Sequence, residues 1–393
     1  MKKYPYLRLL LVVFLVIFVS GCASFTPKTT WRKIYGYAGN EYVNDIIRTK
    51  DGNYILAGMS NSKNINGEDD FYFLKIDKWG NVLWEIFYFG EKDDNAQSVI
   101  ETKDGGLLLL GESYSYATGI SKDLFAIKYD AKGNLAWAKN FGGMDMDGGR
   151  QVIEDNDGNY IFAGWTRSFG QGNSDFYILK LDPNGNLIWS KTWGGINFDE
   201  ANSVVEVEDG YLVLGYTMSF GSGSKDVALV KFDKNGNVIW YKTYGGTKDD
   251  VGNRIEKTRD GNFIIVGSTL SYGTNGDVYV IKVNPNGDVL WERYYGGDSG
   301  DEGECIRATS DGGYIISGNT RSFGASGTAV YLIKLDSYGN LLWQKVYDGD
   351  GDDDGKTVIE TEDNGYILAG LTRSWGASLG DILIMKLNSQ GDF

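Results

Sequence analysis

Short apolar runs separated by polar turns repeat along the whole chain. The unit begins with a run such as SVIET (98–102), followed by a DGG or DGN turn and a second run such as YILAG (366–370). A longer loop such as TRSFGQGNS (166–174) leads to a third run, DFYILKLD (175–182), and a Gly-Asn turn leads to a run that contains Trp. The runs are short and lack helical periodicity, so they predict four antiparallel strands per unit.

The spacing of the repeat indicates the architecture. A Trp recurs every 51 to 53 residues, at Trp31, Trp84, Trp137, Trp189, Trp240, Trp291 and Trp343. A period near 50 residues is typical of propellers and solenoids. Most strand positions are apolar, as expected when neighbouring units cover both faces of each sheet, and hairpin-linked strands favour radial packing. The sequence predicts an all-β fold, a seven-bladed β-propeller with four antiparallel strands per blade, over residues 31–393.

The two ends of the repeat are incomplete in complementary ways. The seventh unit ends with KLNSQGDF, before the Trp that is due, whereas residues 29–37, TTWRKIYGY, contain a Trp run with no preceding partner. We therefore expect the N-terminal strand to complete the last blade by pairing antiparallel with residues 381–387. This pairing would place Trp31 opposite Lys386.

The turn before each Trp follows the pattern Asp-x-x-Gly-Asn-x-x-Trp, as in DPNGNLIW (182–189). It resembles the tryptophan-docking hairpin of quinoprotein-type propeller repeats, with an Asp-to-Trp spacing one residue shorter. Segments such as GGTKDDVGNRI (245–255) and DGGYIISGNTRSFG (311–324) are similar to the β-propeller repeats of bacterial surface and secreted proteins. The resemblance covers all seven units and implies the fold.

Enzymes of the quinoprotein superfamily bind a quinone through acidic, basic and sometimes vicinal Cys residues. This chain has no adjacent Cys pair, so we expect no cofactor.

A Lys recurs on the strand before each Trp strand, at Lys75, Lys128, Lys180, Lys231, Lys282, Lys334 and Lys386. Counting outward from the turn places each Lys opposite the Trp of its hairpin, for example Lys75 opposite Trp84. Because a ligand site seldom needs seven copies, we interpret both sets as scaffold. We expect the Trp side chains to pack between blades and the Lys side chains to stack on the indoles.

The N-terminus has the features of a bacterial lipoprotein signal. A basic start precedes an apolar run from Leu9 to Val19 that is short for a membrane span, and Val19–Cys22 resembles a lipobox. We expect a signal peptide at residues 1–21 and a lipidated Cys22 with a tether that ends at residue 30. The mature protein would be extracytoplasmic, anchored by lipid to the bacterial cell membrane or outer membrane. An uncleaved N-terminal anchor is the alternative.

Charge and composition narrow the function. The formal net charge is −15 at pH 7, and removal of residues 1–21 takes away three positive charges, which leaves −18. The negative charge repels nucleic acid and anionic lipid, so we expect no nucleic-acid partner. We expect the protein to attach to the membrane through acyl chains. The chain has no His, which excludes Ser-His-Asp and Cys-His catalysis and His-ligated metals. With Cys22 lipidated, Cys305 is left without a disulfide partner, and we expect a monomer with this Cys in its core.

The two faces of the predicted propeller differ in their loops. The DGG and Gly-Asn turns are short and nearly invariant, so the opposite face, which carries longer and more variable loops, is the candidate binding face. One acidic residue precedes each innermost strand on this long-loop face: Glu41, Asp94, Asp147, Asp199, Asp250, Asp301 and Asp353. A second acidic set opens the third strand of each unit except the sixth, which has Ala329: Asp70, Asp123, Asp175, Asp226, Asp277 and Asp381.

Aromatic residues occupy the same loops, at Tyr116, Phe169, Phe220, Tyr272, Phe323 and Trp375. Acidic and aromatic side chains on one rim can hold a glycan or a peptide. Alternatively, the acids cap loop amides and the aromatics wedge between blades, and their repetition favours this structural interpretation. Departures from the repeat carry more functional information, namely Trp165, Arg167, Arg321, Arg373 and Trp375.

The densest acidic segment is DGDGDDDG (348–355), which superficially resembles a calcium-binding loop with Asp348, Asp350 and Asp352 as ligands. Its sixth position is Asp353 instead of Gly, and its twelfth is Ile359 instead of a bidentate Glu. We interpret it as an acidic variant of an ordinary loop, with a weak calcium site as the alternative.

These features predict a non-catalytic, lipid-anchored binding or scaffold module with a protein or glycan ligand on the long-loop face. The alternative is a carboxylate-based carbohydrate-active enzyme, which needs two carboxyl groups about 5 to 9.5 Å apart. A deep pocket that contains one carboxyl group with a strongly raised pKa would favour the enzyme. A shallow, evenly acidic rim would favour binding.

Overall fold

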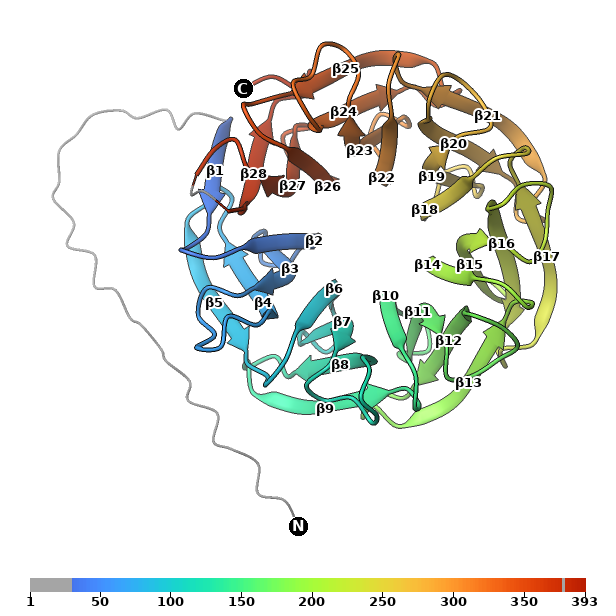
Figure 1. Ribbon diagram of the computed structural model, residues 1–393. Coiled ribbons are helices and arrows are strands. Elements are labelled where there is room, and N and C mark those ends of the chain that lie inside the picture. The colour runs from blue at the N-terminus through green and yellow to red at the C-terminus, as the bar shows by residue number, and fades with distance from the viewer. Residues whose placement is uncertain (1–29, 377–378) are drawn as a thin grey trace, which may run out of the picture.

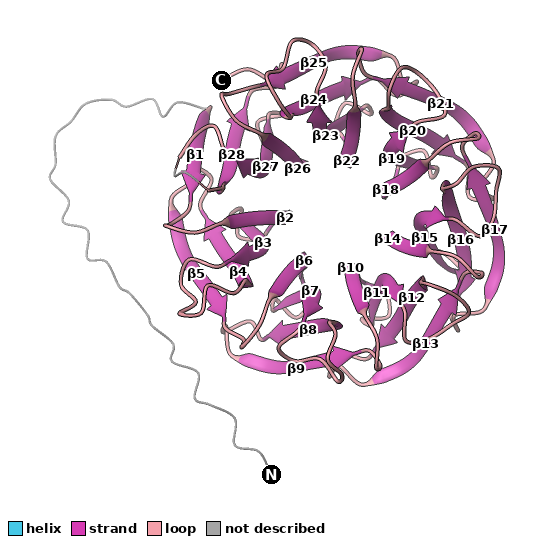
Figure 2. Cartoon of the chain, in the orientation of Figure 1, coloured by secondary structure: helices cyan, strands magenta, loops and turns pink. Residues whose placement is uncertain are grey.

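Six repeat units each fold into one sheet of four antiparallel strands, and the seventh sheet combines three strands of the last unit with the N-terminal strand. The sheets surround a central axis (Figure 1). The computed structural model describes residues 30–376 and 379–393. Its regular elements are strands joined by turns and loops (Figure 2), which confirms the predicted seven-bladed β-propeller. No helix in these two ranges is long and apolar enough to cross a membrane. The predicted signal peptide and Cys22 lie outside the described residues.

The blades are numbered in chain order and each runs from its innermost to its outermost strand. Blade 1 contains β2 (Glu41–Arg48), β3 (Tyr54–Ser60), β4 (Asp70–Ile76) and β5 (Val82–Tyr88); blade 2, β6 (Asp94–Glu101), β7 (Leu107–Ser113), β8 (Asp123–Tyr129) and β9 (Leu135–Phe141); blade 3, β10 (Asp147–Glu154), β11 (Tyr160–Thr166), β12 (Asp175–Leu181) and β13 (Leu187–Trp193); blade 4, β14 (Asp199–Val207), β15 (Gly210–Thr217), β16 (Asp226–Asp233) and β17 (Val238–Tyr244). Blade 5 contains β18 (Asp250–Lys257), β19 (Phe263–Thr269), β20 (Asp277–Val283) and β21 (Val289–Tyr295); blade 6, β22 (Asp301–Ala308), β23 (Tyr314–Thr320), β24 (Ala329–Leu335) and β25 (Leu341–Tyr347); blade 7, β26 (Asp353–Glu360), β27 (Tyr366–Thr372), β28 (Asp381–Leu387) and β1 (Trp31–Tyr35).

The N-terminal strand closes the ring. β1 is the outermost strand of blade 7 and pairs antiparallel with β28, with Trp31 opposite Lys386 and Tyr35 opposite Ile382. Figure 1 shows the two strands, from opposite ends of the described chain, side by side. The predicted closure and its register are confirmed.

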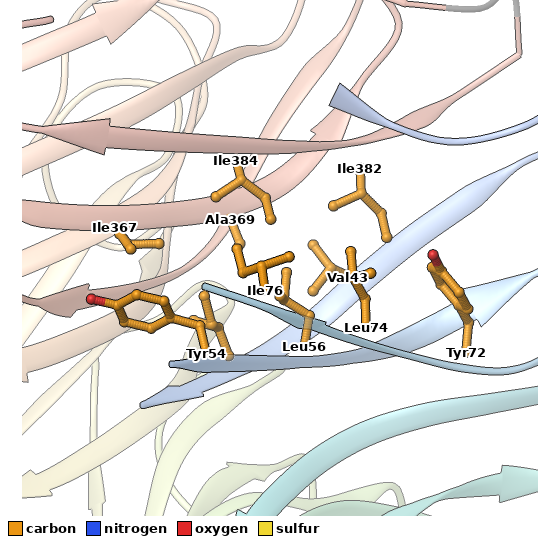
Figure 3. Close-up of a cluster of buried hydrophobic side chains, with 11 residues drawn as sticks. Val43, Tyr54, Leu56, Tyr72, Leu74, Ile76, Ile367, Ala369, Ile382 and Ile384 are labelled. Carbon is orange, nitrogen blue, oxygen red and sulfur yellow. The ribbon is translucent and has the colours of Figure 1, made fainter. Parts of the chain in front are cut away.

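The hydrophobic core is divided among the seven interfaces between adjacent blades. Each buried apolar cluster combines side chains from two neighbouring sheets. At the closing interface, Val43 and Leu74 of blade 1 lie with Ile367 and Ile384 of blade 7 (Figure 3). Both faces of each sheet are therefore covered, which explains why the strands are apolar at most positions instead of alternating.

The repeated Trp docks onto the Gly-Asn turn of the next blade. Trp31 donates from Nε1 to the Lys78 carbonyl at 3.4 Å, and Lys33 Nζ donates to the Gly80 carbonyl at 2.7 Å. Gly80 has a φ of 75°, and a Cβ placed on it would lie 2.8 Å from the Trp31 ring. Only Gly fits this position, because both the backbone and the space above it exclude a side chain. Gly133 in blade 2 differs, since a Cβ placed on it would have no neighbouring atom within 4 Å.

The recurring Lys lies opposite Trp in the predicted register, for example Lys75 opposite Trp84. Its ammonium group, however, forms an ion pair with the Asp of the short turn in the same blade, as between Lys386 and Asp363 at 2.9 Å. All seven blades contain this pair: Lys75–Asp51, Lys128–Asp104, Lys180–Asp155, Lys231–Asp209, Lys282–Asp260, Lys334–Asp311 and Lys386–Asp363. The Lys ammonium groups therefore pair with carboxylates, whereas we expected them to stack on the indoles. The reason is that a largely buried cation needs a carboxylate partner.

Candidate functional site

The innermost strands begin at the long-loop face, and their first residues are the acids of the first set. These seven carboxylates are buried, with exposed fractions of 0 to 4%. Protein donors bind them: Ser219 Oγ and Gly195 N both donate to Asp199 Oδ2, at 2.7 and 2.8 Å. Ser322 Oγ and Gly297 N hold Asp301 in the same way, at 2.9 and 2.8 Å. This arrangement favours the structural interpretation, in which the acids fasten the loops, over direct ligand contact.

The second acidic set is also buried and serves the loops. Gly90 N donates to Asp70 Oδ1 at 2.9 Å, and Gln171 N donates to Asp175 Oδ2 at 2.8 Å. Burial raises the pKa of both carboxyl groups. In the first set, burial raises the pKa of Asp94 to about 6, against the opposing effect of hydrogen bonds from Ser113 and Ser115. These shifted groups lie under loops and have structural partners.

The candidate aromatics and their neighbours occupy different environments. Trp165 is buried, and the Arg167 guanidinium lies 5.6 Å from the ring centres of both Trp165 and Phe198. Trp375 is partly buried at the closing blade, where the guanidinium of Arg32 lies 4.3 Å from its ring centre. The two candidate Phe side chains are about half exposed, at 45% for Phe169 and 48% for Phe323.

A cavity of about 650 Å³ opens on the long-loop side, and residues of blades 4 to 7 line it. Three residues of the predicted binding face line it, namely Arg321, Arg373 and the buried Asp301. Its charged lining also contains Lys225, Asp249, Glu302, Glu304, Asp352, Asp354 and Lys356. The other six acids of the first set lie outside its lining, as do Trp165, Arg167, Phe169, Phe323 and Trp375. The structure therefore brings together only part of the predicted set.

The cavity wall carries a charged cluster from blades 6 and 7. Lys356 Nζ lies 2.6 Å from Glu304 Oε1, and Asn319 Oδ1 accepts a hydrogen bond from Gly355 N at 2.9 Å. Glu302 is exposed at the cavity, where partial desolvation and the nearby Glu304 carboxylate raise its pKa. Desolvation also raises the pKa of Asp354, against the opposing charge of Lys356.

Two exposed guanidinium groups stand at the edge of this cavity. Arg321 Nε donates to Thr328 Oγ1 at 3.2 Å. Arg373 donates to the Tyr42 hydroxyl at 3.3 Å and lies 3.9 Å from the Asp352 carboxylate. Both side chains are exposed, and the ion pair of Arg373 with Asp352 is long. They can therefore bind an anionic or hydroxyl-bearing group that enters the cavity.

The sequence reasoning missed Glu302, Glu304, Asp354 and Lys356 of the cavity wall. Every innermost strand contains a β-bulge, and the bulged residues are Asn44, Gln97, Arg150, Asn202, Asn253, Glu304 and Lys356. A bulge redirects a side chain out of the regular alternation. The signal was available, because this position is polar in all seven repeats while its neighbours are mostly apolar or small.

Backbone donors of the neighbouring 326–328 segment hold the acidic loop at residues 348–355. Ser326 N donates to Asp348 Oδ2 at 3.0 Å, and Thr328 N donates to Asp352 Oδ1 at 2.9 Å. Asp350 is exposed. Across the two described ranges, no group of three or more acidic or Cys side chains is arranged to hold a metal ion.

The fold and its repeats define the class: this chain is a β-propeller protein. Two segments, residues 156–187 and 258–289, match a β-propeller domain of unknown function, DUF5122. The regulatory protein FlaEY of Caulobacter vibrioides is 26% identical over 172 residues, which cover 37% of this chain and only 18% of that protein. Thus the aligned part is less than a fifth of the length of this relative.

Solved structures of low sequence identity share the fold. A protein of unknown function from Dyadobacter fermentans is 10% identical, with a TM-score of 0.53 over 91% of this chain and 98% of that one. Drosophila Plexin A, solved in complex with Semaphorin 1b, is 9% identical, with a TM-score of 0.51 over 91% of this chain and 86% of that one. At such identities the likeness concerns the fold alone.

Proposed function

We propose that this protein is a non-catalytic, extracytoplasmic binding module that holds a protein or glycan ligand at the cavity of its long-loop face. The single observation that carries the proposal is the pair of exposed guanidinium groups, Arg321 and Arg373, at the edge of one cavity of about 650 Å³. Equivalent loop positions of neighbouring blades supply them. Carboxylate and hydroxyl groups of a ligand are suitable partners for such a pair.

The membrane anchor belongs to the same proposal. Trp31 contacts the 77–81 turn, so the first described residues lie at the short-turn side. A lipidated Cys22 and its tether would hold this side toward the membrane, and the long-loop side would face outward. The lipobox-like Val19–Cys22 supports the anchor.

The test is a binding screen with soluble protein, residues 24–393, against glycans and envelope proteins. Arg321→Ala combined with Arg373→Ala should abolish or strongly weaken binding of the ligand found. Arg167→Ala is the matched control, because it has the same position in the repeat but lies outside the cavity lining. Equal binding by the double variant and the wild type would reject the cavity as the ligand site.

A second function, carboxylate-based glycan hydrolysis, is favoured by one observation. Desolvation and Glu304 raise the pKa of Glu302, and a raised carboxyl pKa is what a general acid requires. Glu302→Gln separates the two functions. An enzyme releases product from glycan substrates and loses this turnover in the variant, whereas a binding module releases no product in either form.

A further inference from the structure

A repeated hydrogen bond closes several of the seams between blades on the short-turn side. At four seams a Glu near the end of an innermost strand accepts from a backbone N–H in the short turn of the preceding blade, at 2.6 to 2.9 Å. The pairs are Lys50 N with Glu101, Lys103 N with Glu154, Asn156 N with Glu206, and Ser310 N with Glu360. Each bond ties the turn of one blade to the innermost strand of the next.

The closing seam between blades 7 and 1 has the opposite chemistry. Arg48 stands where those seams have Glu, and Glu362 is the turn residue. A guanidinium has donors only, so Arg48 cannot accept from the turn N–H and instead forms an ion pair with the Glu362 side chain. A cavity of about 250 Å³ remains open at this seam.

The lining of this seam cavity combines aromatic surface with polar groups. Trp79, 46% exposed, and the partly buried Trp31 contribute indoles. Trp79 belongs to the 77–81 turn, and at its position the other turns have Lys132, Asn184, Asn235, Asn286, Tyr338 and Gln390. The ammonium of Lys78 lies 4.6 Å from the ring centre of Trp79. An exposed Trp beside an open cavity is therefore particular to the closing seam among the described turns.

The charged groups of the seam cavity nearly balance one another. Two carboxylates and three cations line it, and two of the cations are already in ion pairs, Arg48 with Glu362 and Lys386 with Asp363. Such a cavity suits a neutral, hydroxyl-rich ligand in a chain whose formal charge is −15. A pyranose ring has an apolar C–H face that matches an indole and a rim of hydroxyls that matches charged donors and acceptors.

We propose that the seam cavity binds one neutral pyranose unit of a glycan, with its C–H face on the Trp79 indole and its hydroxyls toward Arg48, Glu362 and Asp363. This site lies on the opposite side of the propeller from the long-loop cavity. It is independent of the ligand and of the membrane anchor proposed above.

The test is titration of the soluble chain with methyl pyranosides of glucose, mannose, galactose and N-acetylglucosamine, and with a methyl glucuronide as the charged arm. Trp fluorescence and calorimetry report binding. We expect saturable binding of at least one neutral pyranoside. Trp79→Ala should weaken it about tenfold, the upper range for loss of one aromatic stacking contact, whereas Trp79→Tyr should retain most of the affinity.

Tyr338→Ala is the matched control, since it removes the exposed aromatic at the same turn position of blade 6 and should leave affinity unchanged. Unfolding midpoints of both variants verify that they fold. Binding that survives Trp79→Ala, binding lost equally in Tyr338→Ala, a preference for the glucuronide alone, or no saturable binding across the panel would each overturn the proposal. The Arg321→Ala and Arg373→Ala pair should leave pyranoside binding at the seam intact, which separates this site from the long-loop cavity.

Discussion

Trp31 in β1 and Lys386 in β28 are cross-strand partners from opposite ends of the described chain. Lys386 also forms an ion pair with Asp363 in the short turn of blade 7. Trp31 donates a hydrogen bond to the 77–81 turn of blade 1. One pair thus joins the two chain ends within blade 7 and connects that blade to blade 1. We expect the stability of the ring to depend on this non-local pairing, because both strand edges would otherwise be left open.

Trp31→Ala should lower the free energy of unfolding by about 2 to 3 kcal/mol, since it removes a partly buried indole and its docking contact. Deletion of residues 23–37 should cost several kcal/mol more, because the whole closing strand is lost. Chemical denaturation of soluble protein measures both. Trp79→Ala is the control, with an expected change within about 1 kcal/mol for an exposed turn side chain. A Trp31→Ala midpoint equal to the wild type would contradict the closure mechanism.

Gly80 and Gly133 offer a matched test of tryptophan docking. Both have positive φ, 75° and 81°, so Ala at either position costs about 1 to 2 kcal/mol of backbone strain. At Gly80 the added Cβ also meets the Trp31 ring at 2.8 Å, whereas at Gly133 it meets nothing within 4 Å. Gly80→Ala should therefore be more destabilising than Gly133→Ala by about 1 to 2 kcal/mol. Equal losses in denaturant unfolding would show that docking contributes nothing at this turn.

Glu302→Gln should raise stability near neutral pH but leave it unchanged in acid. The pKa of Glu302 in the folded protein lies above its reference value of 4.5, owing to desolvation and Glu304. Below the reference pKa the carboxyl is protonated in both states and contributes no difference. As pH rises through the folded-state pKa, the native protein must ionise a disfavoured group, so wild-type stability falls relative to the Gln variant.

The measurement is the difference in unfolding free energy between wild type and Glu302→Gln from pH 4 to pH 8. Glu91→Gln controls for the change in total charge, since Glu91 is exposed outside the cavity lining. A wild type that gains stability over Glu302→Gln as pH rises would reverse the assigned direction of the shift.

Cys22→Ser should release the protein from the membrane fraction or stop its processing. The expectation follows from the lipobox-like Val19–Cys22 after the apolar run. Mass spectrometry of the wild type should find Cys22 as an acylated first residue. A wild type without acyl groups, together with unchanged fractionation of Cys22→Ser, would reject the lipoprotein assignment.

The local pattern of the sequence was sufficient to predict the propeller scaffold. The seven Trp at nearly regular spacing determine the number of blades, and the strand missing after KLNSQGDF predicts the pairing of residues 31–35 with 381–387. The register of Lys opposite Trp also follows, because hairpin pairing is counted from a turn whose length is visible in the chain. These features depend on local geometry repeated seven times.

Only the tertiary structure decided which side chains meet around the axis and at the seams. Arg321 and Arg373 share a cavity while Arg167, at the same repeat position, lies elsewhere. Glu304 and Lys356 reach the cavity because bulges interrupt the strand alternation. Arg48 and Glu362 meet because the ring closes. The physical reason is that the alternation of side chains along a strand determines which of its residues are buried. Which residues they meet in other blades depends on the radial packing of the units and on the bulges.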